Sequence, residues 1–154
     1  MKKPLPSPSR CATLCALLML LLLICQFLPF WNTGMDTVSI SSYIWFPSDN
    51  AAVTELLRPH TYATFPINDI VTPCVLMLLL SVGTMVFWLF SRENVLLPVC
   101  SLLGSIAGIW VCAAKATFRL GNLWWLILII SILAAASSLL TLMLQYVQRR
   151  SEQE

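Results

Sequence analysis

The run from Val95 to Ala114 constrains the fold more than any other stretch, because it holds 20 residues without a charge. At about 1.5 Å per helical residue, such a run can cross a hydrocarbon core of about 30 Å. Four small residues recur in it at helical spacing: Ser101, Gly104, Gly108 and Cys112. A helix side with so little bulk lets a neighbouring backbone approach closely, which favours helix association in lipid. We therefore expect this run to be the central contact helix of a membrane bundle.

The composition supports a membrane class. The chain has 154 residues, enough for one domain, and 58% of them are hydrophobic. Only 10% are charged, whereas soluble domains average about 25%. The net charge is +2 and the basic residues are scattered, so the sequence gives no sign of a nucleic-acid partner.

Three further apolar runs complete a predicted set of four spans, at residues 11–31, 70–90 and 123–146. The first run exceeds the 7–15 residues of a signal-peptide core and lacks a small-x-small cleavage site, so we expect it to be retained. The predicted fold is an all-α integral membrane four-helix bundle. Its remaining segments are a basic tail (1–10), an outer loop (32–69), a tight turn (91–94), a second outer loop (115–122) and a polar tail (147–154).

The long outer loop carries its own secondary-structure signals. Residues Thr37 to Phe46 alternate between apolar and polar, which predicts a strand closed by Pro47. Ser48 or Asp49 can cap a short helix that runs to about residue 58. A single strand is marginal in water, so it needs a partner strand or the membrane surface.

The distribution of Lys and Arg predicts the orientation. Six lie in the two tails and the tight turn: Lys2, Lys3, Arg10, Arg92, Arg149 and Arg150. Three lie on the other side: Arg58, Lys115 and Arg119. This asymmetry predicts a multi-pass protein of the cell membrane with both termini in the cytoplasm.

The small-residue face of the third span has two interpretations. It can dock a partner's helix or a second copy of the chain. It can also pack on the chain's own spans, which close approach explains without a partner, and the fourth span offers a small-residue surface for this: Ser131, Ala134, Ala135 and Ser138.

Lys115 and Arg119, four residues apart, would share a face if the third helix continues outward. They are candidates for contact with an anionic lipid headgroup. Alternatively Lys115 snorkels and both pair loosely with Asp36 or Asp69, which would contribute little to stability.

The sequence offers no motif for catalysis, a metal or a cofactor. His60 is the only histidine, and the nearby carboxylates are too scattered for a ligand set. The six cysteines include no C-x-x-C pair. The spans carry no Asp, Glu or His, and Gln26 is the only amide in the first span, which disfavours a proton-coupled carrier.

Two resemblances arise from the layout. Four spans with a long first outer loop and a small-residue third span resemble the claudin and peripheral-myelin-protein architecture, but this loop has Trp45 without that family's Gly-Leu-Trp motif or paired cysteines. The segments 27–31, 43–47, 68–69 and 119–121 look like those of uncharacterised short four-span membrane proteins of Gram-positive bacteria. That resemblance implies a plasma-membrane location and no known activity.

These observations predict a non-enzymatic accessory, assembly or structural subunit that acts through helix packing or its outer loop. The alternative is a small oligomeric carrier or channel for an apolar or lipid-like solute, in which the polar residues Gln26, Ser101 and Ser138 would meet across copies. A lipid-modifying enzyme using His60 or Asp69 is a third hypothesis.

Overall fold

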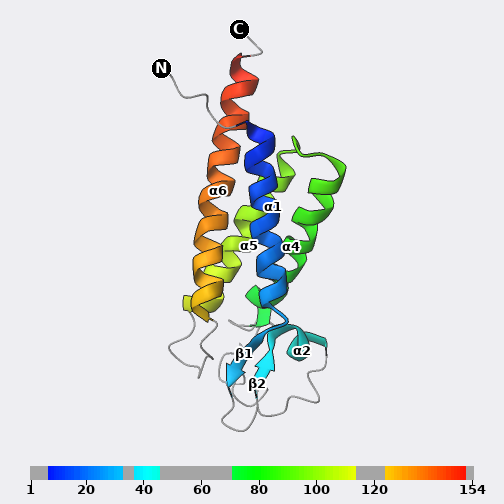
Figure 1. Ribbon diagram of the computed structural model, residues 1–154, viewed down its shortest axis with the longest axis vertical. Helices are drawn as coiled ribbons and strands as arrows, with labels where there is room; N and C mark the ends of the chain where they lie inside the picture. The colour runs from blue at the N-terminus through cyan, green and yellow to red at the C-terminus, as the bar shows by residue number, and fades with distance from the viewer. Residues whose placement is uncertain (1–6, 33–36, 46–70, 114–123, 152–154) are drawn as a thin grey trace, which may run out of the picture.

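The computed structural model describes residues 7–32, 37–45, 71–113 and 124–151. Four long helices form a bundle: α1 (Pro8–Cys25), α4 (Val71–Phe90), α5 (Leu96–Ala113) and α6 (Trp124–Ser151). A small cap of β1 (Pro29–Asn32), β2 (Thr37–Ser39) and the short helix α2 (Ile40–Trp45) follows α1. Figure 1 shows this cap at one end of the bundle, whereas α1 begins and α6 ends at the other end, which we call the terminal end.

All four long helices are long and apolar enough to cross a membrane. Helices α4 and α5 begin and end within one residue of the predicted spans 70–90 and 95–114. Helix α6 continues past the predicted end at Tyr146 to Ser151, because its last residues include no Gly or Pro to stop it. Arg149 and Arg150 in its last turn also suit the negative end of the helix dipole. The chain thus has the architecture of a multi-pass membrane protein.

The first apolar run differs from the prediction, because it does not remain helical to Trp31. Helix α1 starts at Pro8, where a missing N–H costs nothing, and ends at Cys25 with Gln26 as its C-cap. Pro29 disfavours helical backbone in the residue before it. A short turn follows, and the last residues of the run, from Pro29 on, belong to strand β1.

The predicted strand at residues 37–46 is also largely wrong. Only Thr37–Ser39 is a strand, and it pairs antiparallel with β1 across an irregularity between Pro29 and Trp31. The following residues form α2, whose start is tied to α1 because the Ser41 N–H donates to the Gln26 carbonyl at 2.9 Å. Ser39 supports this turn, because its Oγ accepts from the Ser42 N–H at 3.1 Å. The helix predicted from Ser48 or Asp49 lies outside the described residues.

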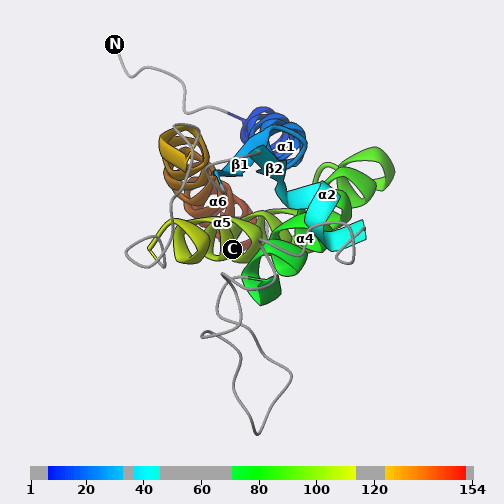
Figure 2. The ribbon, with the colours of Figure 1, turned by 90° about the horizontal axis from the view of Figure 1, so that it is seen from below.

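The four long helices surround a shared interior. Helix α1 packs against α4 and α6, and these two pack in turn against α5. Helices α1 and α5 also touch across the diagonal of this arrangement. Figure 2 shows α4 and α6 on opposite sides, with α1 and α5 between them.

The core follows from these contacts. Fully buried Met19 and Leu22 of α1 meet Met77 of α4 and Ile127 of α6 in one apolar cluster. Val38 and Ile40 of the cap belong to the same cluster. Ile44 of α2 packs against this cluster as well, so the cap is attached to the bundle through three apolar side chains.

Candidate functional site

The small-residue face of α5 lies inside the bundle. Ser101 is fully buried and Cys112 is 3% exposed, and both glycines of the face are buried. A Cβ on Gly104 would lie 2.5 Å from Met19 Cε and 3.2 Å from Leu80 Cβ. A Cβ on Gly108 would clash with Ser131 Oγ and lie 3.3 Å from Met77 Sδ. The chain's own helices occupy this face, so a partner's helix has no access to it.

A cluster of hydroxyl and thiol groups joins α1, α5 and α6 in the buried interior. The hydroxyls of Ser138 and Ser101 share a hydrogen bond of 2.8 Å. Cys15 Sγ lies 3.4 Å from both Ser137 Oγ and Thr141 Oγ1. All five residues are buried. Since these groups bond to one another within the interior, the cluster stabilises the contacts between the three helices.

Gln26 and Ser131 differ from these buried polar residues, because their side chains lack hydrogen bonds. Both amide atoms of Gln26 and the Ser131 hydroxyl are buried without a hydrogen-bond partner in the structure. Gln26, Ser101 and Ser138 are each fully buried within one chain. The three polar residues expected to meet across copies of an oligomeric carrier therefore do not face outward.

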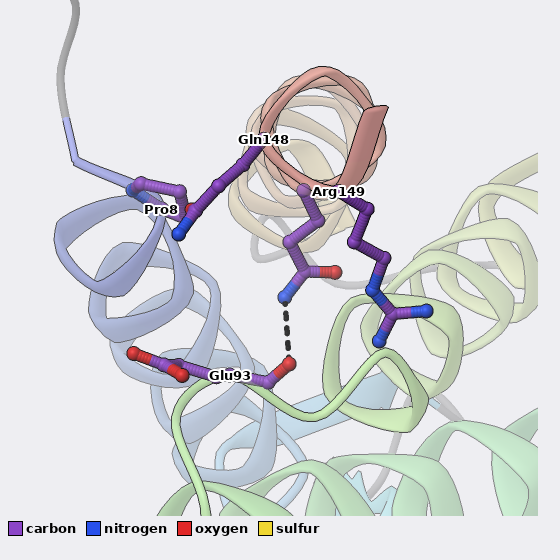
Figure 3. Close-up of a pocket in the computed structure, with 5 residues that line it drawn as sticks. Pro8, Glu93, Gln148 and Arg149 are labelled. Carbon is purple, nitrogen blue, oxygen red and sulfur yellow. Dashed lines mark hydrogen bonds between the residues drawn. The ribbon is translucent and has the colours of Figure 1, made fainter. Parts of the chain in front are cut away.

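A polar pocket of about 120 Å³ opens at the terminal end of the bundle. It lies where the start of α1, the turn between α4 and α5, and the last turns of α6 come together (Figure 3). Its lining residues are Pro8, Glu93, Gln145, Gln148 and Arg149. Figure 3 shows the Glu93 carboxylate and the Arg149 guanidinium on opposite sides of this pocket.

Gln145 is the buried residue of this pocket. Its side chain is 7% exposed, and its Nε2 donates to the Glu93 backbone carbonyl at 3.3 Å. Its Oε1 is buried and has no hydrogen-bond partner. The amide that lines the pocket is thus held in place, and its oxygen is enclosed within the protein without a donor.

An apolar groove of about 320 Å³ adjoins the polar pocket. Gln145 and Arg149 line both, and Val95, Leu142 and Tyr146 complete the groove. Residues 142, 145, 146 and 149 share one face of α6, since they lie three or four positions apart. One helix face therefore carries a cation, an unpaired acceptor and an apolar wall.

Gln145 and Glu93 were not among the predicted site residues, although the sequence of α6 carries a signal for Gln145. Ser131, Ala134, Ser138, Thr141 and Gln145 follow one another at intervals of three or four, and all are buried. This spacing marks one helix face. Gln145 is the one long polar side chain on that face, and it lies where the apolar part of α6 ends. Glu93 had no comparable signal, because its turn has only four residues.

Other predicted site residues lie outside the described residues. They are Lys115 and Arg119, and in the long loop Asp36, His60 and Asp69. Among the described residues, no group of three or more His, Cys, Asp or Glu side chains could hold a metal ion. The six cysteines are free thiols.

Comparisons with known proteins supply no analogous site. No protein-family model, curated protein or solved structure matches the chain.

Proposed function

We propose that this chain is a non-enzymatic accessory, assembly or structural subunit of the cell membrane. It would engage its partners through the outward faces of its helices or through its outer cap and loop. Both termini would lie in the cytoplasm.

The observation that carries this proposal is the closed, uncharged interior. Apart from cysteines, the buried polar side chains of the described residues are all amides and hydroxyls: Gln26, Ser41, Ser81, Thr84, Ser101, Ser105, Ser131, Ser137, Ser138, Thr141 and Gln145. Ion-coupled transport through a bilayer relies on ionisable residues within the spans. A bundle filled with uncharged, mostly paired side chains is better suited to a scaffold than to a solute path.

The outward surface supports the same proposal. Large apolar residues remain exposed on every long helix, for example Leu17 on α1, Leu79 on α4, Leu103 on α5 and Leu133 on α6. Soluble monomers rarely expose contiguous apolar surface on this scale. Lipid, and locally the helix of a partner, would cover it.

The orientation rests on the basic residues near the helix ends. Arg10, Arg92, Arg149 and Arg150 all belong to the terminal end of the bundle. An excess of Lys and Arg marks the cytoplasmic side of a membrane protein. The cap with β1, β2 and α2 would then face outward.

Site-specific photo-crosslinking in cells tests the accessory role. A photoreactive residue would replace Leu17, Leu79, Leu103, Leu133 or the exposed Trp45 of α2 in turn. We expect one of these positions, and not the others, to form an adduct of constant mass with one membrane protein. Adducts with lipid alone at all five positions would contradict the accessory role.

A further inference from the structure

We propose that the apolar groove at the terminal end holds an acyl chain of one anionic phospholipid, whose headgroup phosphate binds Arg149. The lipid would belong to the leaflet that surrounds this end of the bundle. The proposal requires that the bundle is embedded in lipid, and it does not depend on the accessory role.

The lining of the groove calls for an amphiphile. Val95, which directly precedes α5, and Leu142 and Tyr146 of α6 form its apolar wall. Arg149 adds a cation on the same face of α6, one turn beyond Tyr146. Gln145 also lines the groove but is only 7% exposed, so the guanidinium of Arg149 is the charged group that an occupant can reach.

The position of the groove along α6 fits a lipid that lies upright in its leaflet. Trp124 begins this helix, and tryptophans prefer the boundary between lipid and water. At about 1.5 Å per residue, Leu142 lies about 27 Å and Arg149 about 38 Å further along the axis. A hydrocarbon core spans about 30 Å. Leu142 therefore lies at the level of the acyl chains, and Arg149 at the level of the headgroups.

The charge at this end favours an anionic headgroup. Five charged residues belong to the described ranges, and all lie at the terminal end: Arg10, Arg92, Glu93, Arg149 and Arg150. Four cations and one anion give this end a net charge of +3 over those ranges. Anionic lipids are concentrated in the cytoplasmic leaflet and are attracted by Lys and Arg near the membrane surface.

Arg149 is placed to bind the phosphate itself. Its planar guanidinium matches the geometry of a phosphate, and within the described ranges it forms no ion pair with another side chain. The carboxylate of Glu93 lies on the other side of the polar pocket, toward α1 (Figure 3). A phosphate on the groove side of Arg149 can therefore approach the cation without facing this carboxylate.

A phospholipid accounts for both parts of the groove, whereas a soluble phosphate does not. A free phosphate ester would pair with Arg149 but leave the apolar wall of Val95, Leu142 and Tyr146 uncovered. A zwitterionic lipid would cover the wall but lacks the net negative charge that this end attracts. The two alternatives therefore make different predictions for the same measurement.

The test is native mass spectrometry of the full chain, released from mild detergent after addition of phosphatidylglycerol and phosphatidylcholine with identical acyl chains in equal amounts. Phosphatidylglycerol carries a net negative charge and phosphatidylcholine carries none. We expect phosphatidylglycerol to be retained by about fivefold over phosphatidylcholine, the effect of one basic residue close to an anionic lipid. Soluble glycerol phosphate in large excess should not displace it.

Two pairs of variants separate the cation from the apolar wall. Arg149→Gln should abolish the preference for phosphatidylglycerol, whereas Arg150→Gln, which removes the same charge outside the groove, should keep it. Leu142→Trp should fill the groove and lower retention of both lipids. Its matched control is Met143→Trp, which puts the same ring on an exposed neighbour outside the groove and should retain lipid as the wild type does.

The proposal is overturned if the wild-type chain retains both lipids equally, or if Arg149→Gln and Arg150→Gln behave alike. It is also overturned if Leu142→Trp retains lipid as well as Met143→Trp, or if glycerol phosphate displaces the lipid. If Leu142→Trp does not fold, Val95→Trp fills the groove from its other side and should have the same effect. The measurement contains no protein partner, so its failure is distinct from failure of the accessory role.

Discussion

The hydroxyl groups of Ser138 on α6 and Ser101 on α5 lie 2.8 Å apart, and both residues are fully buried. They are 37 positions apart in the chain and form a side-chain hydrogen bond between two adjacent apolar helices. In lipid, where burial of apolar surface does not drive helices together, such a bond and close packing decide which helices associate.

A double-mutant cycle should measure this bond. Ser101→Ala and Ser138→Ala each remove one hydroxyl with little change in volume. We expect a coupling free energy of about 0.6 kcal/mol, and at most about 1.7 kcal/mol, the average and the maximum for interhelical hydrogen bonds in a membrane bundle. The measurement is reversible unfolding in mixed micelles of increasing SDS fraction.

The control for this cycle pairs Ser138→Ala with Ser81→Ala. The Ser81 hydroxyl donates to the Met77 carbonyl at 2.7 Å, so this bond lies within α4 and does not involve Ser138. These two changes should add within about 0.5 kcal/mol. Equal coupling in both cycles would show that the Ser101–Ser138 bond contributes nothing specific.

The glycines of the bundle should differ in their tolerance of alanine. Gly83 has nothing within 4 Å of an added Cβ, so Gly83→Ala should be neutral or slightly stabilising. Gly104→Ala meets chiefly the flexible end of Met19, which can move. Gly108→Ala meets the short side chain of Ser131 on α6, and overpacking of this kind costs about 1–3 kcal/mol.

We therefore expect the loss of stability to rise from Gly83→Ala through Gly104→Ala to Gly108→Ala, measured by the same SDS unfolding. Adding Ser131→Gly should recover most of the loss in Gly108→Ala, because it removes both Ser131 atoms near the new Cβ and leaves only Met77 Sδ, at 3.3 Å. The larger changes Gly104→Leu and Gly108→Leu should unfold the chain itself. If all three alanine variants were equally stable, α5 would not pack through this face.

Gln26 should be replaceable by an apolar residue of similar size. Both its amide atoms are buried without a partner, and each such atom costs about 1–3 kcal/mol. Gln26→Met should therefore leave the unfolding free energy unchanged or raise it. Gln26→Ala should lower it, because a cavity remains. A clear loss of stability in Gln26→Met would mean that the amide has a partner in the membrane, such as an ordered water.

The long helices could be predicted from sequence because their signal is local. An uncharged run such as residues 95–114 has few alternatives to a helix in lipid. The pattern of Ser101, Gly104, Gly108 and Cys112 indicated close packing, but it could not say whose helix fills the space. That answer depends on Met19 and Ser131, which lie in other helices and reach α5 only through the tertiary arrangement.

The wrong predictions concern segments in which the hydropathy of the side chains and the conformational preference of the backbone point to different structures. Phe27, Leu28 and the residues up to Trp31 are as apolar as a span, so hydropathy extends the first helix through them. Pro29 disfavours helical backbone in the residue before it, so the helix does not continue. The segment from Pro29 on pairs with residues 37–39 as a strand. Residues 40–45 alternate like a strand, yet Ile40 and Ile44 pack on the bundle from a helix. The terminal-end pocket was missed because it needs Glu93 and Gln145, which lie 52 positions apart.

The most direct test of the four-span bundle is to measure on which side of the membrane the cap and the end of α6 lie. Single cysteines would replace Trp45 in the cap and Ser151 at the end of α6, and a membrane-impermeant maleimide would be applied to intact cells and to permeabilised cells. The unsubstituted chain is the control for its six native thiols, all of which lie within α1, α4 and α5. We expect Trp45→Cys to react in intact cells and Ser151→Cys to react only after permeabilisation. Equal reaction of both positions in intact cells would contradict a bundle that crosses the membrane between them.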